Sequence, residues 1–253
     1  MTTTTSTGFE IETTHITLPT SDGTTVPAYV ARPAEGKGNG RGLLVYQEAF
    51  GVNEHIRDVT ERFARVGYTA IAPALFHRTD PTFESGYDDF SKVMPHMSAL
   101  TTEGLTADIQ AAYNWLTSPE GGSQTKIGAV GYCLGGRVSF LTDLVVPVKA
   151  AVSYYGGGIA PNPERGQAGL LDRVADLHAP ILLIWGGKDA HLGPDKTRAI
   201  DDALVAAGKS HATITFSEAD HGFSCDVRAS YHPAATAQAQ ALTLAWFDTY
   251  LGE

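Results

Sequence analysis

The residues best suited to chemistry lie in one short run, Gly131, Tyr132, Cys133, Leu134 and Gly135. A sharp turn from a strand into a helix can hold its central side chain in a strained, exposed position, and the flanking residues must then lack bulk. Gly131 and Gly135 meet that requirement around Cys133. The run therefore predicts a nucleophile elbow with a thiol in place of the usual serine hydroxyl. The alternative is that Cys133 is an ordinary buried thiol without reactivity.

The segments on either side of Cys133 have the order that such a turn needs. Residues 126–130 form a short, mostly apolar run suited to a buried strand. Residues 137–144 continue with apolar side chains at helical spacing. The sequence thus predicts strand, turn and helix around Cys133.

A thiol nucleophile needs a base nearby, and the base needs a group that orients it. In α/β hydrolases the chain order is nucleophile, acid and then histidine. Asp189 follows an apolar run and two glycines, and His221 follows a later apolar run, so both have the required order and a loop position. We expect Asp189 to orient His221, and His221 to act as the base for Cys133.

Each of these two candidates has an alternative role. Asp189 could merely cap a helix that begins near Pro194. His191 or Asp195 could then be the working group. His221 could be a surface histidine, since the chain contains 9 histidines and most must have structural roles.

The loop at residues 47–53 is expected to complete the site, because it follows an apolar strand at residues 42–47. This loop could donate one amide of an oxyanion hole, and the amide of Leu134, directly after the nucleophile, would donate the other. Glu48 in the same loop is a candidate to lie near the thiol. Alternatively, Glu48 pairs with an arginine at the start of the next helix, such as Arg57.

The rest of the chain alternates between strand and helix patterns. Residues 10–18 and 25–31 alternate apolar and polar side chains around a Ser-Asp-Gly turn, which predicts an antiparallel hairpin. Further strands are expected at residues 42–47, 68–72, 126–130, 150–154, 180–185 and 212–216, and helices at residues 53–66, 105–116, 137–144, 196–207 and 233–251. This order predicts a mostly parallel central sheet with helices on both faces and reactive groups at the carboxyl ends of its strands.

Composition limits the classes of function. The 253 residues carry a formal charge of -10 without basic clusters, which argues against nucleic acid or an anionic membrane as partner. No apolar run approaches the ~20 residues needed to cross a bilayer, so a soluble protein is expected. Only two cysteines occur, which fits a reducing compartment and a cytoplasmic location. Residues 1–8 are expected to form a disordered tail, and residues 9–253 a single domain.

Four motifs resemble those of the dienelactone hydrolase (carboxymethylenebutenolidase) family. They are QEAFGVN at residues 47–53, GYCLGG at 131–136, GGKD at 186–189 and ADHGF at 219–223, and the resemblance spans roughly residues 14–251. The resemblance implies an α/β-hydrolase fold. The site residues that it implies are the triad Cys133, Asp189 and His221, the amides of Ala49 and Leu134 as the oxyanion hole, and Glu48 beside the thiol in the resting enzyme, where it helps generate the thiolate when substrate displaces it.

The same resemblance implies attack on a small lactone or ester, an acyl thioester on Cys133 and release by water. No metal or organic cofactor is implied, and the sequence lacks ligand spacings such as HExxH. The expected partner is a small-molecule substrate, with the chain a monomer or a small homo-oligomer.

The chain departs from the founding members of this family at two positions that bind a substrate carboxylate. Cys225 stands where they have an arginine, four residues after His221. The family has a second carboxylate-binding arginine in the segment that corresponds to residues 79–97, and here that segment contains only Lys92 as a permanent cation. Arg78 lies nearby and could take the place of this arginine, or it could have a structural role. Because cysteine cannot replace the arginine fork, we expect a less anionic ester or lactone as substrate.

Several aromatic residues are candidates to line the pocket, with core packing as the alternative for each. They are Tyr46, Phe50, Phe76, Tyr87, Tyr154, Tyr155 and Phe223.

Two other readings of the sequence stay open. One is a non-hydrolytic member of the fold that binds a small ligand or senses oxidants, for example through a reversible disulfide between Cys133 and Cys225. The other is a serine esterase, which is weakened because Ser153 and Ser224 lack an elbow context.

Overall fold

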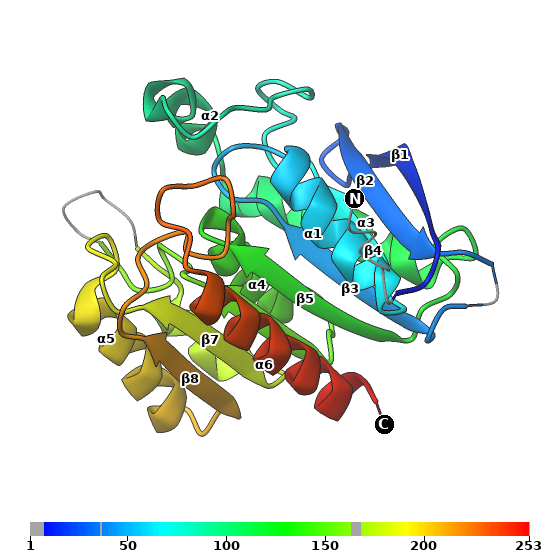
Figure 1. The fold of residues 1–253 in the computed structure, drawn as a ribbon. Helices are drawn as coiled ribbons and strands as arrows, with labels where there is room; N and C mark the ends of the chain where they lie inside the picture. Colours follow the sequence, from blue (N-terminus) through cyan, green and yellow to red (C-terminus); the bar gives the residue numbers. More distant parts are fainter. Residues whose placement is uncertain (1–7, 36, 163–167, 253) are drawn as a thin grey trace, which may run out of the picture.

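The chain begins with an antiparallel hairpin that continues into an eight-stranded sheet (Figure 1). The computed structural model describes residues 8–35, 37–162 and 168–252. The expected disordered tail lies outside the described residues, apart from Gly8. In the hairpin turn, one carboxylate oxygen of Asp22 accepts hydrogen bonds from the hydroxyls of Thr20 and Thr24, and Gly23 has a φ of 82°. The predicted Ser-Asp-Gly turn therefore closes the hairpin.

The sheet has the strand order β1-β2-β4-β3-β5-β6-β7-β8. Its strands are β1 (Ile11–Pro19), β2 (Thr25–Pro33), β3 (Arg41–Tyr46), β4 (Thr69–Pro73), β5 (Lys126–Tyr132), β6 (Ala150–Tyr154), β7 (Ile181–Gly186) and β8 (His211–Phe216). β2 pairs antiparallel with β1 and β4, and every other neighbouring pair is parallel. The predicted mostly parallel sheet with an N-terminal hairpin is confirmed.

Helices cover both faces of the sheet (Figure 1). They are α1 (Glu54–Arg65), α2 (Met94–Ser98), α3 (Thr102–Thr117), α4 (Leu134–Val145), α5 (Gly193–Ala206) and α6 (Pro233–Leu251), with 3-10 turns η1 (Phe90–Lys92) and η3 (Leu171–Asp176). α1 and α6 share one face, where the rings of Phe63 and Phe247 lie 6.2 Å apart. The sequence patterns did not predict α2, η1 or η3, because such short turns have too few residues to show a period.

The helix starts have clear chemical causes. Asn53, which the sequence placed inside the predicted helix at residues 53–66, instead caps α1 by accepting a hydrogen bond from the amide of Ile56. Thr101 caps α3 by accepting from the amide of Gly104. Helix α3 therefore begins earlier than the periodicity from residue 105 indicated, because the cap and not the apolar face sets its start.

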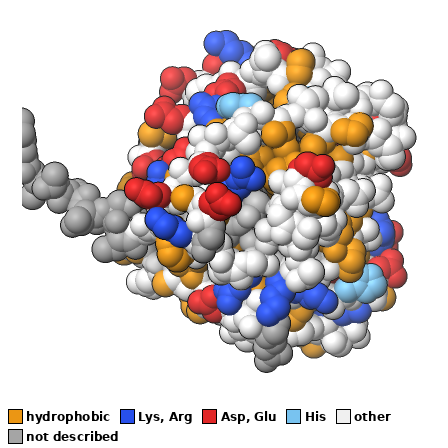
Figure 2. All heavy atoms as spheres, turned by 90° about the vertical axis from the view of Figure 1, so that its right-hand side faces the viewer, with side chains coloured by type: hydrophobic (Ala, Val, Ile, Leu, Met, Phe, Trp, Pro, Cys, Tyr) orange, Lys and Arg blue, Asp and Glu red, His pale blue; other side chains and the backbone are white. Residues whose placement is uncertain are grey.

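Acidic and basic side chains are interspersed on the face of the molecule that Figure 2 shows. Exposed ion pairs of this kind join Arg32 to Glu12 and Lys37 to Glu10 across the hairpin and the segment after it. Among the described residues, no helix is both long and apolar enough to cross a membrane.

The turn between β5 and α4 is packed so closely that it admits only glycines at two positions. A Cβ at Gly131 would lie 1.9 Å from the carbonyl oxygen of Gly135. A Cβ at Gly135 would lie 2.3 Å from the carbonyl oxygen of Tyr46 and 2.6 Å from that of Gln47. The start of α4 therefore touches the end of β3, and this contact brings the loop after β3 to the turn that carries Cys133.

Gly131→Ala is expected to lower the free energy of unfolding by about 3 kcal/mol, because its methyl group would overlap the Gly135 carbonyl and overpack the turn. Gly86→Ala is the matched control, since a Cβ at Gly86 would meet no heavy atom within 4 Å. Urea denaturation of the two variants measures the difference. Equal stability of both variants would contradict the packing described for this turn.

Candidate active site

Four parallel strands deliver their following loops to one edge of the sheet. The loop after β3 carries Glu48, the turn after β5 carries Cys133, and the loop after β7 carries Asp189. The long loop between β8 and α6 carries His221. Carboxyl ends of parallel strands point the same way, so these side chains can converge although they lie far apart in the sequence.

Cys133 has the backbone of a strained elbow. Its φ of 55° and ψ of -113° are unusual for a residue with a side chain. The conformation is held because the Cys133 amide donates to the Tyr154 carbonyl at 3.0 Å and the Cys133 carbonyl accepts from the Gly136 amide at 3.0 Å. The thiol is partly exposed at the N-terminus of α4, unlike that of a fully buried structural cysteine.

Cys133, His221 and Asp189 form a continuous hydrogen-bonded line. The Sγ of Cys133 lies 3.1 Å from Nε2 of His221. The Nδ1 of His221 lies 2.7 Å from Oδ2 of Asp189. The structure thus brings the three predicted residues together in the arrangement of nucleophile, base and orienting acid.

Asp189 is anchored on both carboxylate oxygens. Its Oδ1 accepts from the amides of His191 at 2.8 Å and Leu192 at 3.1 Å, in the turn before α5. Asp189 is therefore not the cap of that helix, whose N-cap residue is Leu192. Burial alone would raise the pKa of Asp189, but the hydrogen bonds from His221 and the two amides outweigh it and lower the pKa. Asp195 does not compete for the role, because its side chain is 95% exposed and pairs with Arg198.

His221 has a strongly perturbed charge state. Burial disfavours its charged form, but the neighbouring Cys133 sulfur and the hydrogen bond with Asp189 outweigh burial and raise the pKa of His221 to about 10. At neutral pH the ring is then an imidazolium that donates to Asp189 and to Cys133.

Glu48 is buried, with 1% of its side chain exposed, and its partner is Arg228. The Nη1 of Arg228 donates to Oε1 of Glu48 at 3.1 Å. Burial raises the pKa of Glu48, while Arg228 and His221 oppose that rise. The alternative partner Arg57 instead binds Glu84 and a backbone carbonyl.

The thiol is not a hydrogen-bond partner of Glu48 among the residues that the structure describes, although the family resemblance implied such a contact. The Oε2 of Glu48 and the hydroxyl of Tyr155 are both buried, and neither has a hydrogen-bond partner among the described residues. The Tyr155 hydroxyl nevertheless lies close enough to help lower the pKa of Glu48. Glu48 is therefore held mainly by Arg228.

Arg228 is the important residue that the sequence analysis missed. Two consecutive turns, from Cys225 back to Gly222 and from Arg228 back to Cys225, return its side chain toward the site. Its guanidinium carbon lies 5.7 Å from the ring centroid of Phe50 and 5.6 Å from that of Tyr87. One signal could have found it, since Arg228 is the only arginine or lysine in the loop at residues 217–232.

The oxyanion-hole prediction concerns the amides of Ala49 and Leu134. Leu134 is the first residue of α4, where amides lack helical acceptors. Among the described residues, neither amide donates to a protein acceptor. The contact of Gly135 with the end of β3 places the two segments side by side. Both amides are therefore free to bind an oxygen.

The predicted pocket aromatics divide into two groups. Phe50 and Tyr87 pack edge to face at 4.6 Å beside Arg228, at the site. Tyr154 is buried, and its hydroxyl bonds to that of Thr243 on α6. Phe223 is fully buried. Tyr154 and Phe223 therefore belong to the hydrophobic core next to the site.

Tyr155 lies nearer to the reacting groups than Tyr154 or Phe223. Its ring centroid is 5.2 Å from that of His221. Its φ of 38° directs this buried side chain out of the strand register at the end of β6. Tyr155 therefore packs directly against the predicted base. The other two candidates, Tyr46 and Phe76, are buried core residues.

Arg78 does not approach Cys133. Its guanidinium makes hydrogen bonds to the carboxylates of Asp22 and Asp108 at 2.6 to 2.9 Å. Each of its three guanidinium nitrogens donates to one of these carboxylates, so the structural alternative for Arg78 fits the structure while the substrate-binding prediction does not. Lys92 is a surface residue: 69% of its side chain is exposed, and its ion-pair partner is Asp89.

Cys225 is buried, and both cysteines are free thiols. Burial raises the pKa of the Cys225 thiol. Cys225 was predicted to lie among the substrate-binding residues. In the structure its thiol is next to the Tyr87 hydroxyl, which opposes the rise in the pKa of the thiol. The proposed reversible disulfide with Cys133 stays a hypothesis.

A mostly parallel sheet with a strained nucleophile turn defines an α/β hydrolase. A model of the dienelactone hydrolase family matches residues 26–251. A relative from Escherichia coli strain K12, named "Putative carboxymethylenebutenolidase", is 35% identical over 238 residues, or 92% of this chain and 86% of the relative. A crystal structure of a "Putative Dienelactone Hydrolase" from Klebsiella pneumoniae has a TM-score of 0.86 and 34% identity, covering 95% of this chain and 100% of that chain. The chain therefore belongs to the dienelactone hydrolase family, as the four motifs indicated.

The His221 ring is expected to stay protonated well above neutral pH, and the Cys133→Ser variant is expected to lower its pKa because the sulfur is the largest favourable influence on it. Titration of the ring by NMR measures both values. Cys225→Ser is the matched control, since this thiol does not contact His221. The folded pKa also exceeds the 6.5 of an ordinary histidine, so the stability that this charge contributes is complete below pH 6.5 and is lost as the pH rises toward 10. An identical His221 titration in wild type and Cys133→Ser would contradict the coupling.

Proposed function

We propose that this protein hydrolyses small lactones or esters through a cysteine nucleophile. One observation carries the proposal, namely the line from Cys133 through His221 to Asp189, with 3.1 and 2.7 Å between their atoms. Its residues come from three separate loops of one sheet edge, which favours a functional origin over chance packing. Family membership supports hydrolysis as the reaction class.

The first half of the reaction forms an acyl-enzyme. The Cys133 thiolate attacks the substrate carbonyl carbon, and the carbonyl oxygen becomes an oxyanion that the amides of Ala49 and Leu134 stabilise. The tetrahedral intermediate collapses with cleavage of the bond from carbon to the ester oxygen. The leaving alkoxide takes the proton from Nε2 of His221. The products are an alcohol, or the ring-opened end of a lactone, and a thioester on Cys133.

The second half releases the acyl group. The now neutral His221 accepts a proton from water as the water attacks the thioester carbonyl. Collapse of this second tetrahedral intermediate expels the Cys133 thiolate, which the re-formed imidazolium stabilises. Asp189 keeps the ring orientation fixed through both proton transfers, because its own carboxylate is held by two amides.

Arg228 supports a substrate that carries a carboxylate. Its side chain is 19% exposed, and its guanidinium lies near the rings of Phe50 and Tyr87 and donates to the Glu48 carboxylate. A substrate carboxylate would compete with Glu48 for the guanidinium and release Glu48 toward the thiol, which is the role that the family resemblance implied for Glu48. The expectation of a less anionic substrate rested on the absence of an arginine near the site, and Arg228 removes that reason.

Cys133→Ala is expected to reduce the hydrolysis of an activated acetate ester by at least about 10³-fold, because the acyl-enzyme cannot form. Mass spectrometry of the quenched wild-type reaction should find one acetyl group, on Cys133. Ser153→Ala is the matched control, since the Ser153 hydroxyl is buried without a hydrogen-bond partner among the described residues and has no elbow geometry. Its activity should match that of wild type.

Unchanged turnover in Cys133→Ala would overturn the cysteine mechanism for this class of substrate. Loss of turnover in Ser153→Ala alone would revive the serine reading. Alkylation of Cys133 without turnover of any ester or lactone would favour the non-hydrolytic, ligand-binding or redox-sensing alternative.

A pair of variants tests the role of Arg228. Glu48→Gln and the double variant Glu48→Gln/Arg228→Gln both lack the Glu48 charge, so neither leaves an unpaired carboxylate in the site. The ratio of kcat/KM for a lactone with a carboxylate to that for its neutral analogue is expected to fall about 10- to 100-fold from the single to the double variant, which corresponds to one charge-assisted hydrogen bond. An equal ratio in both variants would show that Arg228 does not select the carboxylate.

A further inference from the structure

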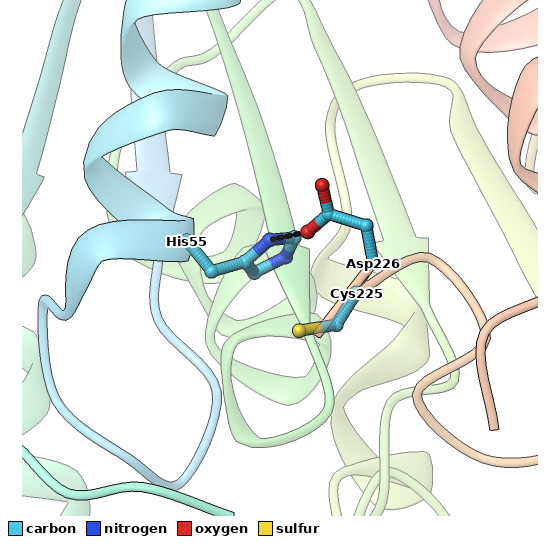
Figure 3. A group of neighbouring side chains, drawn as sticks. All are labelled: His55, Cys225 and Asp226. Atoms are coloured by element: carbon cyan, nitrogen blue, oxygen red, sulfur yellow. Dashed lines mark ion pairs between the residues drawn. The ribbon is translucent and has the colours of Figure 1, made fainter. Parts of the chain in front are cut away.

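A second group of ligand-type side chains lies beside the active site. Figure 3 shows His55 on helix α1 facing Cys225 and Asp226 on the loop between β8 and α6. One ring nitrogen, the Sγ and one carboxylate oxygen all lie within 4.8 Å of one another. The proposed hydrolysis uses none of these three donors.

The imidazole of His55 has no hydrogen bond to explain its position. Its side chain is 2% exposed, and neither ring nitrogen makes a hydrogen bond within the described residues. Its one charged contact there is the pair with Asp226 drawn dashed in Figure 3, in which Nδ1 and Oδ1 lie 3.7 Å apart, beyond hydrogen-bond distance. The ring also packs at 6.4 Å against that of Tyr132. Buried polar groups are nearly always paired, so a ring with two unpaired nitrogens needs an explanation.

The catalytic line has the same three residue types but a different geometry. Cys133 and Asp189 bind opposite edges of the His221 ring, through Nε2 and Nδ1. One ion cannot bind all three of those donors. At His55 the donors converge on one volume instead, as a chelating site requires.

We propose that His55, Cys225 and Asp226 form a zinc site. Zinc is of borderline softness and takes thiolate, imidazole and carboxylate ligands at about 2.0–2.3 Å, which sets the donors of a tetrahedral site about 3.3–3.8 Å apart. The observed separations of up to 4.8 Å need an inward movement of roughly 1 Å to reach those lengths. A water or another small ligand would take the fourth position.

The surroundings allow an ion to enter. Asp226 has 51% of its side chain exposed, so the site opens to solvent on the carboxylate side. Arg62 lies 3.8 Å from the second oxygen of Asp226 and would have to yield to the metal. Arg62 can do so without losing its charge partner, because it also pairs with Asp58.

The site adjoins the reacting groups through the backbone. The amide of Arg228 donates to the carbonyl of Cys225 at 3.1 Å, and the Arg228 side chain holds Glu48. Closure of Cys225 and Asp226 on a metal would therefore act on the turn that positions Arg228.

Equilibrium dialysis of the folded full-length chain with Zn²⁺, in the presence of a phosphine reductant that does not chelate metals, tests the site. We expect wild type to bind one zinc ion per chain. Cys225→Ser is expected to weaken the affinity by more than about 100-fold, above the range for an outer partner of a metal ligand. Co²⁺ should give wild type a thiolate-to-metal absorption band that Cys225→Ser lacks. Both readouts are independent of catalysis.

Two further comparisons separate this site from the catalytic residues. Cys133→Ser should keep the zinc and the cobalt band, since Cys133 lies outside the cluster. Asp226→Asn, at a half-exposed position that should not disturb folding, should lose affinity as Cys225→Ser does, while Asp202→Asn on the surface of α5 should not. The proposal would be overturned if folded wild type bound no zinc, or if Cys225→Ser and Asp226→Asn bound zinc as tightly as wild type does. A cobalt band lost only in Cys133→Ser would overturn it as well.

Discussion

The positive φ of Cys133 is the constraint on which the rest of the site depends. A side chain in this backbone region is tolerated only where neighbouring contacts determine it, and here the amide and carbonyl of Cys133 are both held by backbone partners. The turn is so tight that Gly131 and Gly135 have no room for a Cβ. The same closeness joins the start of α4 to the end of β3, so one steric condition both holds the turn that carries the sulfur and brings the loop after β3 beside it.

Electrostatics then divide the site into two coupled pairs. The first is Cys133 with His221, in which the ring is held in its charged form with Asp189 behind it. The second is Glu48 with Arg228, in which a buried carboxylate depends on one guanidinium. His221 also lowers the pKa of Glu48, so the pairs influence each other.

The sequence predicted the fold, and also which three residues, Cys133, His221 and Asp189, the structure brings together, because both depend on local patterns in a fixed order. The elbow glycines, the strand before Asp189 and the loop of His221 each have a local signature, and topology alone brings them together. Arg228 had no such signature. Its place at the site depends on two successive turns after Gly222, which reverse the chain within a few residues. Distance along the sequence from His221 was therefore a poor guide to which cation would reach the pocket.

Aromatic side chains were the other weak point of the sequence reading. Tyr154 and Tyr155 are neighbours of the same type, yet one bonds to Thr243 in the core while the other packs on His221. Tyr155 lies just past the end of β6 and has a φ of 38°, so its position is set by an unusual backbone conformation and not by the strand. Composition and spacing cannot show such a change in backbone conformation.

The loop between β8 and α6 concentrates several tasks in one short piece of chain. Within eight residues it supplies His221, the buried Cys225, the carboxylate of Asp226 and the guanidinium of Arg228. An exchange of this loop between relatives would transfer the histidine beside Cys133, the guanidinium beside Glu48 and two side chains of the neighbouring cluster together. Divergence of specificity in this scaffold can therefore proceed by the replacement of one loop, while the sheet and the elbow stay the same.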